Sequence, residues 1–192
     1  MFTQPELTTG TNAYRATTAT VPLRLDARRE GYVERTVVTS DGVRLAVRDY
    51  GSDGPRDHTV VLLHGLCLTQ SSWSPQVRYL VGRWGNRVRI ISYDHRGHGQ
   101  STGADMHTYR IDRLAADLAD VLTALRVTGP LTLAGHSMGG MTALAYLSRA
   151  AADRPVEPQG LVLVGTAAGR LAERGLGRLL GTRATGMLFN LV

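Results

Sequence analysis

The stretch Gly135-His136-Ser137-Met138-Gly139-Gly140 decides the fold that we expect for this chain. The apolar residues just before it are typical of a short buried strand, and the small-residue-rich segment after it is typical of a helix. A serine on such a sharp strand-to-helix turn needs a positive φ, and only small residues two positions before and after it avoid a clash. Gly135 and Gly139 are those residues, so Ser137 is a candidate nucleophile.

The same turn also has a purely structural interpretation, in which glycines pack a helix onto a strand and Ser137 only caps the helix N-terminus. A Gly-x-Ser-x-Gly pattern can arise by chance in a chain with 22 glycines, so its context matters. The context favours chemistry, because the N–H groups and positive dipole at a helix N-terminus would lie beside Ser137 Oγ and favour a developing anion.

Strand-like and helix-like segments alternate along most of the chain. Ser40-Asp41-Gly42 is typical of a hairpin turn between two β-rich runs, and the segment from Ile111 to Arg126 has apolar residues at the helical period. We expect strands at residues 33–39, 43–50, 59–63, 88–93, 131–134 and 161–164, and helices at 72–82, 111–126 and 138–149. This order predicts an α/β fold, with a mostly parallel central sheet of six strands and helices on both faces.

Three regions follow from this pattern. Residues 1–30 lack periodicity and are expected to form a flexible N-terminal arm, and residues 31–168 are expected to form the core. Residues 169–192 are expected to begin a lid. Arg170, Arg174 and Arg178 recur there every four residues among leucines, so a helix that lies on a membrane surface is the alternative.

Composition excludes several classes of protein. The formal charge of +6 comes with 22 basic residues, all arginine, but these are dispersed and do not predict nucleic-acid binding. The single cysteine, Cys67, cannot form an internal disulfide and is expected to be a small buried apolar residue. There is no membrane-length apolar run and no signal-like start, so we expect a cytoplasmic location. No metal or cofactor is expected.

A second motif, His64-Gly65-Leu66-Cys67, follows the expected strand at 59–63. An oxyanion hole needs two N–H groups, one from the residue after the nucleophile and one from the loop after this strand. Met138 and Leu66 are the candidates, and Gly65 would let the backbone turn the Leu66 amide inward. His64 is one candidate base, but a histidine at the end of a strand more often has a structural role.

The third motif is Asp94-His95-Arg96-Gly97-His98-Gly99-Gln100-Ser101, after the strand at 88–93. Together the three motifs, in this order and spacing, resemble those of the α/β-hydrolase superfamily over residues 32–168. The resemblance implies a serine hydrolase that acts on carboxylic esters or related acyl compounds. It implies Ser137 as nucleophile, the Leu66 and Met138 amides as oxyanion hole, and Gly135, His136, Gly139, His64 and Gly65 as elbow and rim. The loop at 94–101 would be mainly structural.

The family places the catalytic acid and then the histidine after the serine. The last histidine here is His136, and the acids after Ser137 are Asp153, Glu157 and Glu173, of which only Glu173 is expected on the correct side of the sheet. We therefore expect an incomplete triad and a C-terminally truncated chain. A catalytically inactive fragment or pseudoenzyme is the first alternative. A nucleotide-binding protein that uses Gly97, Gly99 and Gly103 is a weaker one. Ser137 in place of an aspartate disfavours epoxide hydrolysis, whereas esterase, lipase, acyltransferase, perhydrolase and C–C hydrolase chemistry remain open.

Overall fold

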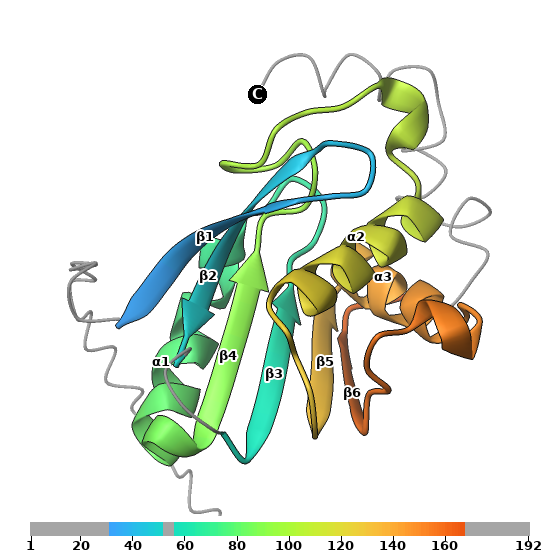
Figure 1. The fold of residues 1–192 in the computed structure, drawn as a ribbon. Helices are drawn as coiled ribbons and strands as arrows, with labels where there is room; N and C mark the ends of the chain where they lie inside the picture. Colours follow the sequence, from blue (N-terminus) through green and yellow to red (C-terminus); the bar gives the residue numbers. More distant parts are fainter. Residues whose placement is uncertain (1–30, 52–55, 168–192) are drawn as a thin grey trace, which may run out of the picture.

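The computed structural model describes residues 31–51 and 56–167. They form one six-stranded sheet in the order β1-β2-β4-β3-β5-β6 (Figure 1). The strands are β1 (Tyr32–Val38), β2 (Arg44–Tyr50), β3 (His58–Leu63), β4 (Val88–Tyr93), β5 (Leu131–His136) and β6 (Gly160–Val164). β1 pairs antiparallel with β2, and β2 with β4, while β4, β3, β5 and β6 are mutually parallel. The predicted mostly parallel α/β sheet is confirmed.

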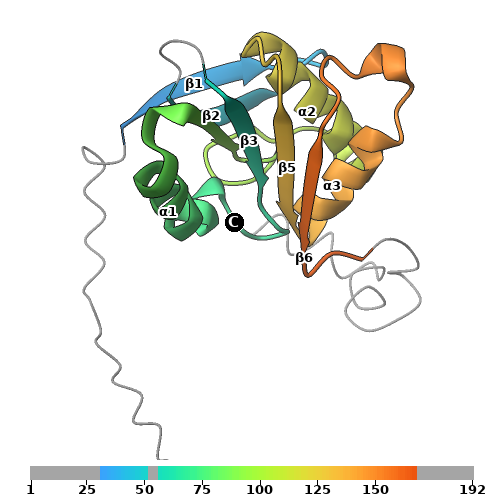
Figure 2. The ribbon, with the colours of Figure 1, turned by 90° about the horizontal axis from the view of Figure 1, so that it is seen from below.

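Helices cover both faces of this sheet, as predicted (Figures 1 and 2). One face carries α1 (Ser74–Trp84), and the other carries α2 (Ile111–Ala124) and α3 (Met138–Leu147). The helices lie on different faces because each crossover between parallel strands is right-handed, so the direction of travel across the sheet decides the face. The chain moves in one direction from β3 to β4 and in the opposite direction from β4 to β5 and β6. Among the described residues, four short 3₁₀ segments lie between these elements: η2 (Gln70–Trp73), η3 (Gly85–Arg87), η4 (Met106–Thr108) and η5 (Ala151–Asp153).

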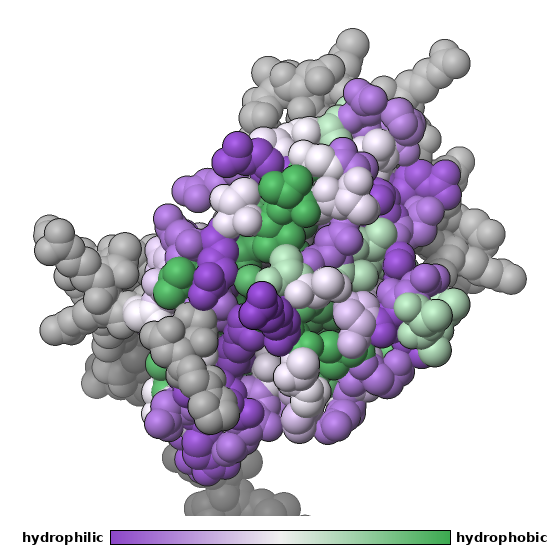
Figure 3. Space-filling model, viewed as in Figure 1, coloured by the Kyte–Doolittle hydropathy of each residue, from purple (hydrophilic) through white to green (hydrophobic). Residues whose placement is uncertain are grey.

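The apolar core is divided unequally between the two faces. The larger cluster lies between the sheet and α2 and α3, where Leu118, Val121 and Leu122 of α2 are buried against strand residues such as Leu133. The smaller cluster lies under α1 and includes Leu62, Trp73 and Val77. From outside, the face that carries α2 and α3 shows interspersed polar and apolar residues (Figure 3).

β6 is an edge strand within the described part of the chain, and its apolar side chains are poorly covered. Leu161, Val162, Leu163 and Val164 are 37%, 48%, 42% and 45% exposed, respectively. The expected arm at 1–30 and the expected lid region at 169–192, including Glu173, lie outside the described residues. Among the helices that are described, none combines the length and apolar character needed to span a bilayer.

Candidate active site

Ser137 lies at the sharp turn between β5 and α3, with φ 49° and ψ −110°. A positive φ is uncommon for a residue with a side chain, and strained backbone conformations cluster at functional sites. The Ser137 N–H donates to the Val164 carbonyl over 2.9 Å, so the end of β6 holds the turn in place. The Ser137 hydroxyl makes no hydrogen bond to any described residue and is half-buried at the carboxyl edge of the sheet.

The glycines around Ser137 are required by close backbone contacts. A Cβ on Gly135 would collide with the backbone of Gly139 and Gly140, because α3 begins directly against the end of β5. A Cβ on Gly139 would collide with the Leu63 carbonyl and lie 2.7 Å from the His64 carbonyl oxygen. The small residues on either side of the serine therefore bring the N-terminus of α3 onto β3 and β5.

The loop after β3 lies beside this turn. A Cβ on Gly65 would lie 2.6 Å from Nδ1 of His136, so the imidazole next to the serine packs on the backbone of the loop. The Leu68 N–H donates to the Gly65 carbonyl over 3.2 Å and closes a tight turn. Neither the Leu66 amide nor the Met138 amide donates a hydrogen bond within residues 31–51 and 56–167.

The prediction that Cys67 is buried is wrong. Its side chain is exposed, and its φ of 58° places it in the left-handed region at the outside of the turn. The apolar character of cysteine could not indicate this, because the position is set by the turn from Gly65 to Leu68 rather than by packing.

His64 is completely buried and both of its ring nitrogens have partners. Nε2 accepts a hydrogen bond from the backbone N–H of His95 over 2.9 Å, so Nδ1 carries the proton and donates to the Gly65 carbonyl over 2.8 Å. Burial lowers the pKa of His64 to about 4, opposed by the bond to Gly65. This ring joins the end of β3 to the loop after β4, which fits a structural role.

His95 and His98 lie close to His64. The His64 and His95 ring centroids are 4.5 Å apart, and those of His64 and His98 are 5.2 Å apart. His95 is completely buried, and neither of its ring nitrogens has a partner among the residues described. Burial lowers the pKa of His95 well below its ordinary value, and the neighbouring imidazoles lower it further. Burial therefore keeps the His64 and His95 rings neutral near pH 7.

Asp94 ties together the loops that follow β3 and β4. Its carboxylate accepts hydrogen bonds from the backbone N–H of Gln70, over 2.7 Å, and of Gln100, over 3.0 Å. Gln70 also donates to it through its side chain over 3.3 Å, although sequence analysis had not singled this residue out. These bonds hold the rim around the Ser137 turn.

Arg96 anchors the same loop to the body of the protein. Its buried guanidinium forms a bidentate pair with buried Asp117 of α2, at 2.6 and 2.7 Å, and a second pair with Asp41. Burial raises the pKa of Asp117 above its ordinary value, opposed by Arg96. The bond to Arg96 contributes most to holding the pKa of Asp41 far below its ordinary value. The sequence did not predict these partners of Arg96. Asp117 is 21 positions and Asp41 is 55 positions from Arg96, and no short-range pattern links residues so far apart.

The fold thus brings five of the expected rim and elbow residues, namely His64, Gly65, Gly135, His136 and Gly139, around Ser137. Asp153 and Glu157 lie between α3 and β6, away from the carboxyl edge where Ser137 is found. No group of His, Cys, Asp and Glu side chains within the described ranges is arranged to hold a metal ion.

Comparison with known proteins agrees with this geometry. The family described as "alpha/beta hydrolase fold" matches residues 58–187. The chain is 39% identical to a non-heme chloroperoxidase of Streptomyces lividans over 124 residues, which is 62% of this chain and 41% of that protein. It is 36% identical to a bifunctional esterase/perhydrolase of Acinetobacter calcoaceticus over 118 residues, 59% of this chain and 38% of that protein. The chain thus spans about two fifths of the length of these curated relatives.

Solved structures lead to the same conclusion. An esterase from Exiguobacterium antarcticum superposes with a TM-score of 0.61 at 29% identity, covering 74% of this chain and 48% of the esterase. An epoxide hydrolase from Vigna radiata superposes with a TM-score of 0.58 at 25% identity, covering 70% of this chain and 38% of the hydrolase. The sheet order, the turn that carries Ser137 and these matches together show that the chain belongs to the alpha/beta hydrolase fold family.

Proposed function

We propose that this chain carries the nucleophile and oxyanion hole of a serine hydrolase that acts on carboxylic esters or related acyl compounds. The observation that carries the proposal is the Ser137 turn. A serine held at φ 49°, directly before α3 and between close-packed glycines, presents its hydroxyl at the carboxyl edge of a parallel sheet. A serine that served only as an N-cap would use its side chain to accept a bond from the helix, and Ser137 makes no such bond.

In the proposed reaction, Ser137 Oγ attacks the acyl carbon and loses its proton, and the carbonyl oxygen becomes an oxyanion. The Leu66 and Met138 amides, which have no acceptor in the described structure, would donate to that oxygen. The N-terminus of α3 adds positive potential at the same place. Collapse of the intermediate expels the alcohol and leaves an acyl-enzyme, which water then hydrolyses to the acid.

Removal of the Ser137 hydroxyl proton is the step for which this chain offers the least suitable base. All six histidines lie at or before His136, and both ring nitrogens of His64 are engaged in hydrogen bonds. We therefore infer that the 192-residue chain by itself activates Ser137 weakly, and that a base from outside these residues would increase its reactivity. Ser137, rather than an aspartate, at the turn favours acyl chemistry over the epoxide opening named for one structural neighbour.

The test is labelling of the purified chain by a fluorophosphonate probe, with and without added imidazole as an external base. We expect slow labelling that imidazole accelerates several-fold, with loss of the label in Ser137→Ala. Ser72→Ala is the matched control, because Ser72 is an exposed serine near the same edge of the sheet. Equal labelling of wild type and Ser137→Ala would refute the proposal. Fast labelling without imidazole, abolished in Ser137→Ala, would show that a base within the chain already activates Ser137.

Two relatives, a non-heme chloroperoxidase and a bifunctional esterase/perhydrolase, favour perhydrolysis as a second candidate activity. The acyl-enzyme on Ser137 would then be attacked by hydrogen peroxide instead of water, which releases a peracid and returns the proton to Ser137 Oγ. The measurement is the ratio of peracid to carboxylic acid formed from an acetate ester in peroxide. An unchanged yield of carboxylic acid with no peracid would leave hydrolysis as the activity.

A further inference from the structure

The loop after β3 contains a peptide unit whose two polar groups have different partners. Its carbonyl belongs to Gly65 and its N–H belongs to Leu66, the candidate oxyanion donor. A trans peptide is planar, so its carbonyl oxygen and its amide hydrogen point in opposite directions across the C–N bond. No peptide bond among the described residues is cis. The contacts that fix the Gly65 carbonyl therefore also fix the direction of the Leu66 N–H.

Two donors hold the Gly65 carbonyl. Nδ1 of His64 donates to it over 2.8 Å, and the Leu68 N–H donates to it over 3.2 Å. A carbonyl oxygen has two lone pairs, so it can accept both bonds at once. The bond from His64 is the shorter one, and it comes from a completely buried side chain. We therefore regard the imidazole as the main contact that fixes this peptide.

The backbone of His95 decides which nitrogen of His64 carries the proton. The His95 N–H donates to Nε2 of His64 over 2.9 Å, and a backbone N–H can only donate. Nε2 is therefore the acceptor, so the neutral ring carries its proton on Nδ1 and presents it to the Gly65 carbonyl. Hydrogen bonds in such a chain polarise one another, which makes the Leu66 N–H a stronger donor.

The main chain of His64 lies against the turn that carries the nucleophile. A Cβ on Gly139 would lie 2.7 Å from the His64 carbonyl oxygen, so α3 begins directly beside this residue. Met138, whose N–H is the second candidate oxyanion donor, immediately precedes Gly139. One residue therefore contacts both parts of the expected oxyanion hole. Its side chain holds the peptide of Leu66, and its main chain packs on the turn of Met138.

We propose that His64 is a positioning residue for the oxyanion hole. Its Nδ1–H holds the Gly65 carbonyl so that the Leu66 N–H faces the oxygen of an acyl group bound at Ser137. The inference rests on the proposed function, because it requires Ser137 as nucleophile and the Leu66 amide as donor. A role limited to joining β3 to the loop after β4 would require only the bond from the His95 N–H to Nε2.

Two substitutions separate these roles, because each keeps one of the two hydrogen bonds. His64→Asn places an amide N–H near the position of Nδ1, where it can still donate to Gly65. His64→Gln places an amide oxygen near the position of Nε2, where it can still accept from the His95 N–H. If His64 positions the oxyanion hole, His64→Asn should resemble wild type more closely than His64→Gln does. A role limited to joining the two loops predicts the reverse.

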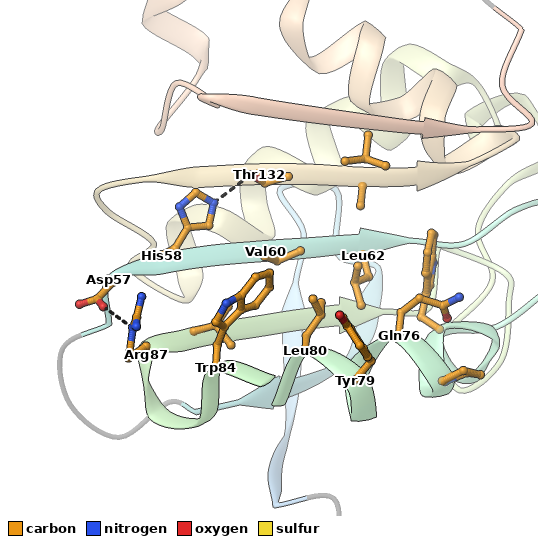
Figure 4. Close-up of a pocket in the computed structure, with 15 residues that line it drawn as sticks. Asp57, His58, Val60, Leu62, Gln76, Tyr79, Leu80, Trp84, Arg87 and Thr132 are labelled. Carbon is orange, nitrogen blue, oxygen red and sulfur yellow. Dashed lines mark hydrogen bonds and ion pairs between the residues drawn. The ribbon is translucent and has the colours of Figure 1, made fainter. Parts of the chain in front are cut away.

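His58 provides a matched control at the other end of the same strand. It is the first residue of β3, and its Nε2 is hydrogen-bonded to Thr132 Oγ1 over 2.8 Å. It lines a mainly apolar hollow of about 740 Å³ beside α1, with Leu80 and Trp84 on the opposite side (Figure 4). Ser137 is not among the residues that line this hollow. His58→Gln therefore changes a hydrogen-bonded histidine of β3 away from the nucleophile.

The test is the reaction of Ser137 with a fluorophosphonate in the presence of imidazole, since the phosphoryl oxygen of the probe takes the place of the oxyanion. We expect His64→Gln to lower the limiting rate of labelling at least tenfold, with little change in the half-saturating probe concentration. Loss of one oxyanion-hole donor typically costs about 100-fold or more in rate. His64→Asn should lower the rate less than threefold, and His58→Gln should not change it. Urea unfolding checks that each variant is folded.

The ³¹P signal of the labelled serine gives a second readout that needs no variant, because the phosphonyl adduct does not titrate. Burial lowers the pKa of His64 to about 4, opposed by the Gly65 carbonyl, while His98 lowers it further and Asp94 raises it. A proton on Nε2 would face the His95 N–H, and these two donors would push the ring from its position. We expect the signal to move toward that of the urea-unfolded adduct as the pH falls through about 4.

The outcomes separate this inference from the proposed function. Absence of label on Ser137 in wild type would refute both. Label on Ser137 at equal rates in wild type and His64→Gln would refute this inference alone. A rate in His64→Asn as low as that in His64→Gln, or lower, would show that His64 does not orient the Leu66 amide. An unchanged pH midpoint of the ³¹P shift in His64→Asn would also overturn it, because another group, such as His98 or His136, would then control the site.

Discussion

The carboxyl ends of β3, β4 and β5 differ sharply from the region around β6. Around Ser137, glycines pack backbone against backbone, and Asp94, Arg96 and His64 each have several polar partners. Along β6, four successive apolar residues are more than one third exposed. The difference shows that the Ser137 turn and its rim are held by described residues, whereas the apolar surface of β6 is incompletely covered by the residues described.

The largest loss of stability is expected at Arg96, which anchors the loop after β4. Arg96→Ala would leave Asp117 buried without its bidentate partner, because both side chains are completely inaccessible to solvent. Removing one partner of a buried ion pair costs about 3–5 kcal/mol. We therefore expect the free energy of unfolding in urea to fall by that amount. Arg113→Ala is the control, since Arg113 also contacts Asp117 but is 23% exposed and should cost much less. Equal losses of unfolding free energy in Arg96→Ala and Arg113→Ala would mean that the buried pair with Asp117 does not stabilise the fold more than an exposed contact does.

A matched pair of leucines compares the two regions directly. Leu133 of β5 and Leu161 of β6 are register partners on adjacent strands, yet Leu133 is 0% exposed and Leu161 is 37% exposed. Leu133→Ala should cost about 3 kcal/mol, as expected for a buried leucine that leaves a cavity. Leu161→Ala should cost about 1 kcal/mol or less, because less packing is lost. Urea titration of both variants measures the difference. Comparable costs would show that β6 is covered as fully as β5.

The third prediction concerns acid and the buried histidines, and its expected effect is the smallest. The pKa of His64 is about 4 in the folded chain and about 6.5 when unfolded, and that of His95 is also lowered. Between these values the unfolded chain binds more protons, so the free energy of unfolding should fall as pH decreases from about 6.5 to 4. Above pH 6.5 this contribution is fully present. For His64 alone the loss should reach roughly 1–3 kcal/mol.

The variant that tests this explanation is His64→Asn, whose amide can still donate and accept one hydrogen bond each but does not titrate. It should flatten the fall in unfolding free energy between pH 6.5 and 4. His107→Gln is the control, because His107 is exposed and lies in η4, away from the cluster. If His107→Gln flattens the profile as much as His64→Asn, the buried cluster is not the cause.

Sequence patterns with a short period predicted most of the fold. The apolar stripe of α2 was visible because residues such as Leu114, Leu118 and Leu122 recur at the helical period, and all three are buried. The helices begin or end about two residues from the predicted positions; α1, for example, begins at Ser74 because η2 forms a separate turn before it. Gly135 and Gly139 were informative because the tight turn at Ser137 brings backbone atoms so close to them that a side chain would collide.

Other features depend on residues that the folded sheet brings together. The bond between His64 and the His95 amide, the pairing of Arg96 with Asp117 and Asp41, and the position of Gln70 at Asp94 all join separate loops. Such contacts leave no periodic signal, because they depend on the strand order rather than on local backbone preference. Cys67 was misjudged for the same reason, since a tight loop turn decides its exposure.

The sequence alone therefore determined the class of fold, the turn that presents Ser137 and the order of the three motifs, since each depends on a few neighbouring residues and their allowed backbone conformations. Only the tertiary structure decided which loops meet, which histidines are buried, and where the apolar hollow beside α1 lies. These properties arise when strands distant in sequence pair side by side and helices pack across them, which no local pattern specifies.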